Sequence, residues 1–210
     1  NIKNFIYASS SSAYGDHESL PKVEDVIGKP KNPYSITKYV NELYANTFEE
    51  HYNFKTIGLR YFNVYGPRQR ENGDYAAVIP KWIKNILNKQ DVEIYGDGKT
   101  SRDFCYIDNA VQANIIAALS ENEIAKGQVY NISVGDQTSL NNLFSMIHNN
   151  IENAIGENIK ARPIYKDFRA GDIRHSRADI SKAKKLLNYL PTHNVEKGII
   201  ETVNWYIDNK

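Results

Sequence analysis

Two apolar segments separated by a long amphipathic helix restrict this chain to a parallel α/β architecture. Phe5 to Ser9 is an apolar run of strand length that leads into four consecutive serines, and Thr56 to Tyr61 is a second such run. Between them, Asn32 is a good N-cap residue and Pro33 suits the first position of a helix. A strand, a helix and a second strand in this order form the crossover unit that builds parallel sheets.

The same periodicity predicts further elements along the chain. Val129–Ile132 is a third apolar strand, preceded by a helix over 108–120, and other helices are expected over 78–87, 140–151 and 195–208. Several side chains recur at helical spacing after Pro33, which predicts that this face of the first helix is buried. They are Ile36, Val40, Leu43, Tyr44, Thr47 and Phe48.

Charge and cysteine usage exclude several classes of function. The 210 residues carry a formal net charge of +1, which provides no basic field for nucleic acid. No apolar run approaches the roughly 20 residues needed to span a bilayer. Cys105 is the single cysteine, so no disulfide framework is possible, and the 5 histidines show no metal-ligand spacing. We expect a cytoplasmic protein without a structural metal.

Tyr34 and Lys38 place a phenol and an ammonium group one helical turn apart. An ammonium group beside a phenol favours the phenolate, which can act as a general base. The same spacing occurs at Tyr95 with Lys99 and at Tyr206 with Lys210. The former spans a glycine-rich turn and the latter the last residues, whereas Tyr34 opens a capped helix downstream of the serine cluster. The context therefore favours a catalytic role for the first pair.

Several motifs in this order resemble the extended short-chain dehydrogenases/reductases, and within them the nucleotide-sugar 4-epimerases. Residues 101–107, 39–44 and 174–176 resemble the bacterial UDP-N-acetylglucosamine 4-epimerases and their uronic-acid-processing relatives most closely. The matching family motifs are Ala8–Gly15, Pro33–Lys38, Leu59–Pro67, Gly96–Gly98 with Arg102–Phe104, and Phe168–Asp172.

The resemblance implies a fold and a domain organisation. It implies an α/β fold with a partial Rossmann-type parallel sheet and a smaller α/β lobe. The C-terminal part of the NAD-binding domain would comprise residues 1–62 and 103–134, and the UDP-sugar-binding lobe residues 63–102 and 135–210. It also implies that the full-length protein is a homodimer, formed through the helix after Asn32.

The resemblance further implies NAD as the cofactor and Ser10, Tyr34 and Lys38 as catalytic residues. Tyr34 and Lys38 would also contact the nicotinamide ribose, and Tyr61 and Phe62 would flank the nicotinamide end. The implied cofactor-binding set is Ala8, Ser9, Tyr34, Lys38, Tyr61 and Phe62.

A UDP-sugar carries a diphosphate, which favours arginine. The resemblance assigns Arg102 and Arg169 to the diphosphate and Asp172 to the uridine ribose, although a single surface arginine is as often held in a solvated salt bridge. Ser176 would limit the room around the hexose, and a small residue there suits an N-acetylated sugar. Of the other implied substrate residues, Ser11 and Ser12 line the sugar, Asn63 and Gln69 lie in the pocket, and Ala77, Val78, Glu93 and Tyr95 border the uracil.

These residues lead us to expect reversible inversion at carbon 4 of a UDP-hexose, with UDP-N-acetylglucosamine and UDP-N-acetylgalactosamine as the pair. One alternative is a 4-epimerase for UDP-N-acetylglucosaminuronic acid. Another is a nucleotide-sugar dehydratase or decarboxylase, but residues 9–13 lack the acidic group that those relatives place there. A third is a non-catalytic nucleotide-binding member of the family, which we would expect to have lost Tyr34 or Lys38.

The glycine-rich turn that receives a dinucleotide pyrophosphate at a helix N-terminus does not occur in this sequence. The first apolar strand also begins within a few residues of Asn1. We therefore expect that the natural protein is longer, that this fragment alone is inactive, and that its sheet has an exposed apolar edge.

Overall fold

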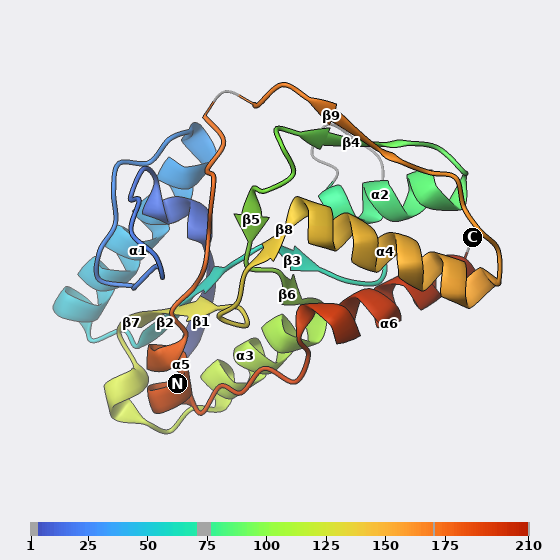
Figure 1. Cartoon of the computed structure of the whole chain (residues 1–210). Coiled ribbons are helices and arrows are strands. Elements are labelled where there is room, and N and C mark those ends of the chain that lie inside the picture. The colour runs from blue at the N-terminus through green and yellow to red at the C-terminus, as the bar shows by residue number, and fades with distance from the viewer. Residues whose placement is uncertain (1–3, 71–76, 170, 210) are drawn as a thin grey trace. The chain divides into compact units, whose positions relative to one another are not determined.

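The chain forms two compact units, each built from several separate segments. The computed structural model describes residues 4–70, 77–169 and 171–209. Unit 1 comprises 1–64, 103–136 and 176–192, and unit 2 comprises 65–102, 137–175 and 193–210. Both contain helices and strands, so the predicted α/β class is confirmed (Figure 1).

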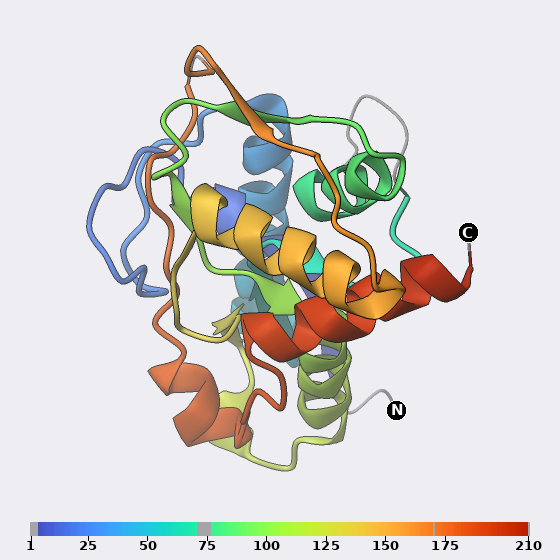
Figure 2. The same cartoon turned by 45° about the vertical axis from the view of Figure 1, so that its right-hand side comes forward.

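Unit 1 is built on a three-stranded parallel sheet. Strands β1 (Phe5–Ser10), β2 (Thr56–Tyr61) and β7 (Gln128–Ile132) lie in the order β1-β2-β7, as the crossover pattern predicts. Helix α1 (Pro33–Tyr52) covers one face of the sheet and α3 (Ile107–Leu119) covers the other (Figure 2). The central strand β2 is almost entirely buried because both faces are covered. The remaining elements of unit 1 are η1 (Ser11–Tyr14), β6 (Cys105–Tyr106), η2 (Glu123–Ala125) and α5 (Ser181–Leu187).

Helix α1 begins where the sequence predicts, but its apolar stripe is exposed. The side chain of Asn32 accepts a hydrogen bond from the Ser35 N–H at 2.8 Å, and the Ser35 hydroxyl accepts one from the Asn32 N–H at 3.1 Å. This reciprocal capping box fixes the first turn. The prediction of a buried apolar face was wrong, because the face of α1 that contacts the sheet buries Ser35 and Glu42. Exposed residues of the stripe are Ile36, Val40, Leu43, Tyr44 and Phe48.

Unit 2 packs three helices and two small sheets. Helices α2 (Val78–Leu87), α4 (Leu140–Ile155) and α6 (Val195–Asp208) bury apolar side chains against one another, with α4 beside α6 (Figure 2). No helix in the described ranges is long and apolar enough to cross a membrane. Strand β4 (Val92–Tyr95) pairs in parallel with β9 (Pro163–Lys166), and β5 (Ser101–Arg102) pairs antiparallel with β8 (Thr138–Ser139). The short strand β3 (Val64–Tyr65) spans the boundary between the segments of units 1 and 2.

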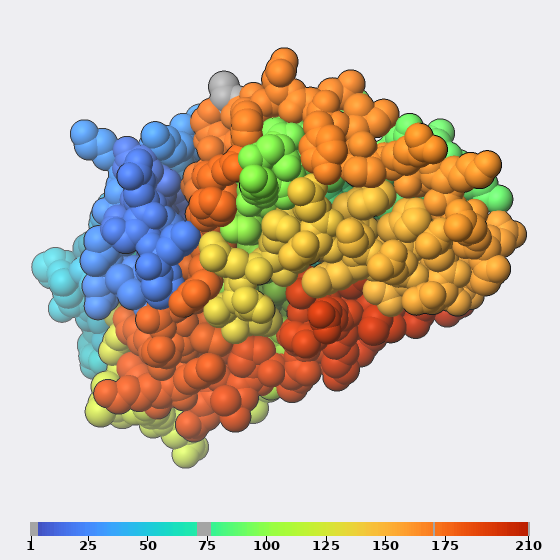
Figure 3. Space-filling model, in the orientation of Figure 1, coloured from blue at the N-terminus to red at the C-terminus, as the bar shows by residue number. Residues whose placement is uncertain are grey.

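Residues 176–192 belong to unit 1, whereas the sequence places them in the smaller lobe. The reason is a set of hydrogen bonds to distant parts of unit 1. The Lys22 N–H donates to the Arg177 carbonyl at 2.7 Å, and the Asp179 N–H donates to the Lys22 carbonyl at 2.8 Å. The Tyr189 hydroxyl donates to the Ser133 carbonyl at 2.9 Å. In Figure 3 this orange-red stretch lies directly beside the blue N-terminal loop.

Candidate functional site

Tyr34 and Lys38 lie together at the carboxyl end of β1, in unit 1. The Lys38 ammonium is 5.7 Å from the centre of the Tyr34 ring and donates a hydrogen bond to the Ala8 carbonyl at 3.1 Å. The Tyr34 side chain is 56% exposed, so it is accessible to a ligand. Lys38 therefore joins the first turns of α1 to the strand that carries the serines.

The serine cluster turns the chain from β1 into η1. Ser10 is the N-cap of this short helix, and its Oγ accepts a hydrogen bond from the Ser12 N–H at 3.2 Å. The Oγ of Ser12 is buried and has no hydrogen-bond partner within the described part of the chain. Gly15 ends the turn with a φ of +57°, and a Cβ there would lie 2.0 Å from the Lys29 carbonyl oxygen. Ser10 to Ser12 are thus fixed at the strand end, with one buried hydroxyl left unbonded.

Ser9 has a different environment from its neighbours. It is 3% exposed, and its hydroxyl donates a hydrogen bond to the Glu42 carboxylate on α1. Because this hydroxyl is bonded to Glu42, the side chain of Ser9 connects β1 to α1, and its predicted contact with the cofactor stays a prediction.

A buried ion pair that the sequence analysis missed lies beneath these groups. Arg60 on β2 donates from Nε and Nη2 to the two oxygens of Glu42, at 2.8 and 2.7 Å. Its Nη1 donates to the Glu24 carbonyl at 2.9 Å, and its guanidinium lies 4.7 Å from the centre of the Tyr14 ring. Burial opposes the charge on Arg60, but the hydrogen bonds to Glu42 raise the pKa of the guanidinium above its usual value. The sequence signal was Glu42 itself, an acidic residue one turn beyond Lys38 on the same helical face.

Tyr61 and Phe62, predicted for the nicotinamide end, and the predicted substrate residue Asn63 lie at the carboxyl end of β2, in three different environments. The Tyr61 hydroxyl donates to Asn114 Oδ1 at 3.0 Å, and burial raises the pKa of this phenol. Phe62 is fully buried in the core of unit 1, 6.0 Å from the Tyr14 ring, so its side chain serves packing. Asn63 is exposed, but its Nδ2 donates to the Asp103 carbonyl at 2.8 Å. The roles of all three residues at a bound ligand stay predictions.

Asp103 joins three segments of unit 1. Its Oδ1 accepts hydrogen bonds from the Ser133 hydroxyl at 2.5 Å and the Val134 N–H at 3.2 Å. Its Oδ2 accepts from the Gly135 N–H at 3.1 Å and the Ala178 N–H at 3.0 Å. Burial raises the pKa of Asp103 to about 6, in opposition to these hydrogen bonds, which lower it. The predicted substrate residue Ser176 is 9% exposed and lies two residues before Ala178.

The raised pKa of Asp103 predicts a pH-dependent stability. Between about pH 6 and pH 4, the folded protein binds a proton at Asp103 that the unfolded chain, with a pKa near the ordinary 3.8, does not bind. The contribution of this group to the free energy of unfolding therefore falls as the pH rises from about 4 through 6, by about 2–3 kcal/mol at most. Urea unfolding of the protein and of Asp103→Asn at several pH values measures this difference. A difference that does not change with pH would contradict the assignment.

In unit 2, Arg102 and Asp172 form an ion pair. Arg102 Nη2 donates to Asp172 Oδ1 at 2.7 Å, and Nη1 donates to the Ser101 carbonyl at 2.9 Å. The Arg102 side chain is only 17% exposed, and burial lowers the pKa of its guanidinium. The structure thus brings together the residues predicted for the diphosphate and for the uridine ribose, and gives each a protein partner.

A second group in unit 2 lies where β4 and β9 run side by side. The Arg169 guanidinium stacks 3.8 Å from the centre of the Tyr95 ring, and the Lys166 ammonium lies 3.7 Å from the Glu93 carboxylate. Gly96 has a φ of +84°, and a Cβ there would lie 2.3 Å from the Phe168 ring. Glu93, Tyr95 and Arg169 are therefore neighbours in unit 2, and their roles at a nucleotide stay predictions.

The other predicted substrate residues of unit 2 are less informative. Ala77 and Val78 are half-buried at the start of α2, where Ala77 is the N-cap without a side-chain bond. The Gln69 carbonyl accepts a hydrogen bond from the Tyr206 hydroxyl. Ala170, which forms part of the Phe168–Asp172 motif, lies outside the described residues.

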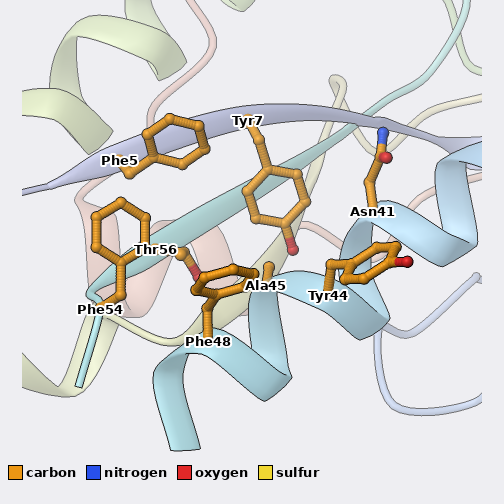
Figure 4. Close-up of a pocket in the computed structure, with 8 residues that line it drawn as sticks. All are labelled: Phe5, Tyr7, Asn41, Tyr44, Ala45, Phe48, Phe54 and Thr56. Carbon is orange, nitrogen blue, oxygen red and sulfur yellow. The ribbon is translucent and has the colours of Figure 1, made fainter. Parts of the chain in front are cut away.

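An apolar groove of about 410 Å³ lies between β1 and α1, away from the predicted site residues (Figure 4). Its lining carries no charged group, which makes it unsuited to a nucleotide. β1, which contributes to this groove, is an edge strand of the described sheet. The lining residues are Phe5, Tyr7, Asn41, Tyr44, Ala45, Phe48, Phe54 and Thr56.

Comparison with known proteins agrees with the fold. Residues 1–133 match the NAD dependent epimerase/dehydratase family. The chain is similar to the structure of a UDP-N-acetylglucosamine 4-epimerase from Methanobrevibacter ruminantium M1 in complex with UDP-N-acetylmuramic acid. The two are 41% identical with a TM-score of 0.88, over 100% of this chain and 64% of that one.

Other relatives differ in their substrates. A UDP-glucuronic acid 4-epimerase from Bacillus cereus, in complex with UDP-glucuronic acid and NAD, is 31% identical with a TM-score of 0.85, over 99% of this chain and 62% of that one. A putative UDP-glucose 4-epimerase from Methanocaldococcus jannaschii is 36% identical over 100% of this chain and 65% of its own length. The chain therefore spans less than two thirds of each of these relatives.

Proposed function

We propose, from the premise that this chain belongs to the NAD-dependent epimerase/dehydratase family, that the complete protein inverts carbon 4 of a UDP-hexose. The observation that carries this proposal is the arrangement of Tyr34 and Lys38 at the carboxyl end of β1, next to Ser10–Ser12. Similarity to 4-epimerases of three different UDP-sugars supports the reaction type.

The residues of unit 1 fit one end of NAD. Lys38 presents an ammonium group beside the exposed Tyr34 phenol, and these are donors suited to ribose hydroxyls. The buried Oγ of Ser12, which has no partner within the described residues, is a polar group for which the bound sugar would supply a partner beside this end of NAD. The sequence contains no glycine-rich pyrophosphate turn, so the fit extends to the nicotinamide ribose and no further.

In this mechanism the protein positions the sugar and moves one proton. NAD, when bound, supplies the acceptor and later the donor of the carbon 4 hydride. The Tyr34 phenolate takes the proton of the 4-hydroxyl as carbon 4 is oxidised to a ketone, and Ser10 holds the reacting oxygen. The 4-keto sugar then presents its other face, and Tyr34 returns the proton to the oxygen as carbon 4 is reduced. Lys38 places its ammonium group 5.7 Å from the centre of the Tyr34 ring, beside the reacting phenol.

UDP-N-acetylglucosamine is the substrate we propose. The support is the small side chain of Ser176 and the likeness, at 41% identity, to a UDP-N-acetylglucosamine 4-epimerase. The second candidate is the uronic acid form of the same sugar, which the likeness to a UDP-glucuronic acid 4-epimerase favours.

The test is an assay of the complete protein with NAD and each of three sugars: UDP-N-acetylglucosamine, UDP-glucose and UDP-N-acetylglucosaminuronic acid. We expect the 4-epimer of UDP-N-acetylglucosamine to form fastest. Faster turnover of the uronic acid would select the second candidate. Binding of UDP with no epimer from any of the three would refute the proposed reaction in favour of a dehydratase, a decarboxylase or a non-catalytic binder.

Arg102→Met tests the UDP-binding role of unit 2. If Arg102 binds the diphosphate equally in the ground state and the transition state, its loss should raise KM by about 10- to 100-fold and leave kcat within about 2-fold. Lys89→Met, at an exposed ion pair with Glu157 in the same unit, is the control and should change neither constant by more than about 2-fold. An unchanged KM in Arg102→Met would leave Arg102 with only its contacts within the chain, to Asp172 and to the Ser101 carbonyl.

A further inference from the structure

Glu42 connects helix α1, which carries Tyr34 and Lys38, to the strands β1 and β2 at the end where the serines lie. Its carboxylate accepts a hydrogen bond from Ser9 Oγ and two from Arg60, at 2.8 and 2.7 Å. The Glu42 and Arg60 side chains are 6% and 4% exposed, so solvent does not replace these bonds. Through Ser9 and Arg60, the carboxylate joins α1 to the ends of β1 and β2, whose residues Ser9 and Arg60 are direct neighbours in the register.

The helical spacing extends this connection to the reacting groups. Tyr34, Lys38 and Glu42 follow one another at intervals of four residues, on one face of α1. Lys38 donates to the Ala8 carbonyl, and Glu42 accepts from Ser9, the next residue of the same strand. Two consecutive turns of α1 are therefore attached to two consecutive residues of β1. This sets where Tyr34 lies relative to Ser10, one residue further along.

Arg60 extends these contacts to the turn that carries Ser10–Ser12. Its guanidinium lies against the Tyr14 ring, and Tyr14 is the last residue of η1, which begins directly after Ser10. The Tyr14 hydroxyl is itself fixed by a hydrogen bond to Asn131 Oδ1 at 2.7 Å. A displaced Arg60 would therefore move both ends of the segment that carries the three serines.

We propose that Glu42, through Ser9 and Arg60, is the positioning residue that fixes the Tyr34 phenol relative to the Ser10–Ser12 hydroxyls. The proposal rests on the proposed function, because it takes these groups as the ones that contact the sugar. It goes further in assigning a catalytic consequence to a carboxylate that does not touch the substrate. A misplacement of about 1 Å in such an arrangement can lower a rate by about 100-fold.

Glu42→Gln tests the assignment by exchanging a single heavy atom, one carboxylate oxygen for an amide nitrogen. The amide offers one acceptor oxygen where the carboxylate offers two, and it leaves the buried Arg60 without its counter-charge. We expect kcat of the complete protein to fall by about 10- to 100-fold, with KM for the UDP-sugar within about 2-fold. Glu49→Gln is the matched control, since Glu49 lies on the same helix and pairs with Lys55 at 2.6 Å. It should change kcat by less than about 2-fold.

A double variant separates positioning from stability. Replacing a buried ion pair with apolar side chains of similar size is often neutral or stabilising. Glu42→Leu combined with Arg60→Met should therefore restore the Tm lost in Glu42→Gln, whereas kcat should remain at least about 10-fold low. Recovery of kcat together with Tm would overturn the proposal, because the pair would then serve only the fold. Normal kcat in Glu42→Gln would overturn it as well.

Hydrogen exchange gives a readout that needs no activity. The Ser12 N–H is bonded to Ser10 Oγ, so its exchange reports the order of the serine turn. We expect residues 10–14 to exchange faster in Glu42→Gln and in the double variant, and at the normal rate in Glu49→Gln. Unchanged exchange in the first two would refute the positioning role, even if the protein forms no epimer. Absence of epimer from the unsubstituted protein would refute the proposed function alone.

Discussion

Tyr34→Phe should leave the complete protein able to bind UDP and NAD but lower its rate of 4-epimerisation by about 10²- to 10⁴-fold. The substitution removes the hydroxyl that takes and returns the proton, and it keeps the ring. Because Tyr34 is 56% exposed and outside the buried core, the fold should lose little stability. The loss should therefore appear in kcat, with KM nearly unchanged.

The assay measures epimer formation from UDP-N-acetylglucosamine by both proteins under the same conditions. Tyr52→Phe is the control, because Tyr52 lies at the last turn of the same helix and is 72% exposed. It should retain the full rate. Epimerisation by Tyr34→Phe within about 3-fold of the normal rate would exclude Tyr34 as the general base, and Ser10 or a water would then have to accept the proton.

Local signals predicted most of the secondary structure. Asn32 and Pro33 mark the beginning of α1 because a capped helix start depends on neighbouring residues alone. The apolar run that became β2 is buried between two helical layers, and such strands are continuous in hydrophobicity. The run that became β1 lies at the edge of the described sheet, and most of its residues are exposed or half-buried. The bounds of α2 and α6 agree with the predicted ranges, because helical periodicity also depends on residues that are close in the sequence.

Long-range pairing could not be read from the sequence. The apolar stripe of α1 predicted the wrong buried face. Glu42 and Arg60, 18 residues apart, pair where α1 contacts the sheet, and this pair buries the polar face of the helix. The partner of a buried charge depends on strand register, which the periodicity of one helix does not contain. The sequence could have flagged Glu42, since it continues the spacing of Tyr34 and Lys38.

In the candidate site too, local arrangements could be predicted from the sequence and long-range pairs could not. The adjacency of Tyr34 and Lys38 follows from helix geometry, and it is present in the structure. The ion pair between Arg102 and Asp172 joins residues 70 positions apart, and the packing of Phe62 depends on the whole core of unit 1. Family resemblance named these residues, but it did not contain their partners within the chain.

Asp103→Ala should be the most destabilising single substitution in unit 1, with a loss of about 3–6 kcal/mol in the free energy of unfolding. The carboxylate accepts hydrogen bonds from the Ser133 hydroxyl and from three backbone N–H groups, of Val134, Gly135 and Ala178. Asp103 is fully buried, and each buried donor left without an acceptor costs about 1–3 kcal/mol.

Urea unfolding followed by circular dichroism measures this loss, with Asp25→Ala as the control. The Asp25 side chain is 92% exposed and lies 3.9 Å from the Lys182 ammonium, so its removal should cost less than about 0.5 kcal/mol. Asp103→Asn should fall between the two, because its amide keeps one acceptor oxygen for two of the four donors. A loss below about 1 kcal/mol in Asp103→Ala would mean that water can enter and satisfy these donors. Residues 176–192 would then be held to unit 1 by packing, with little contribution from Asp103.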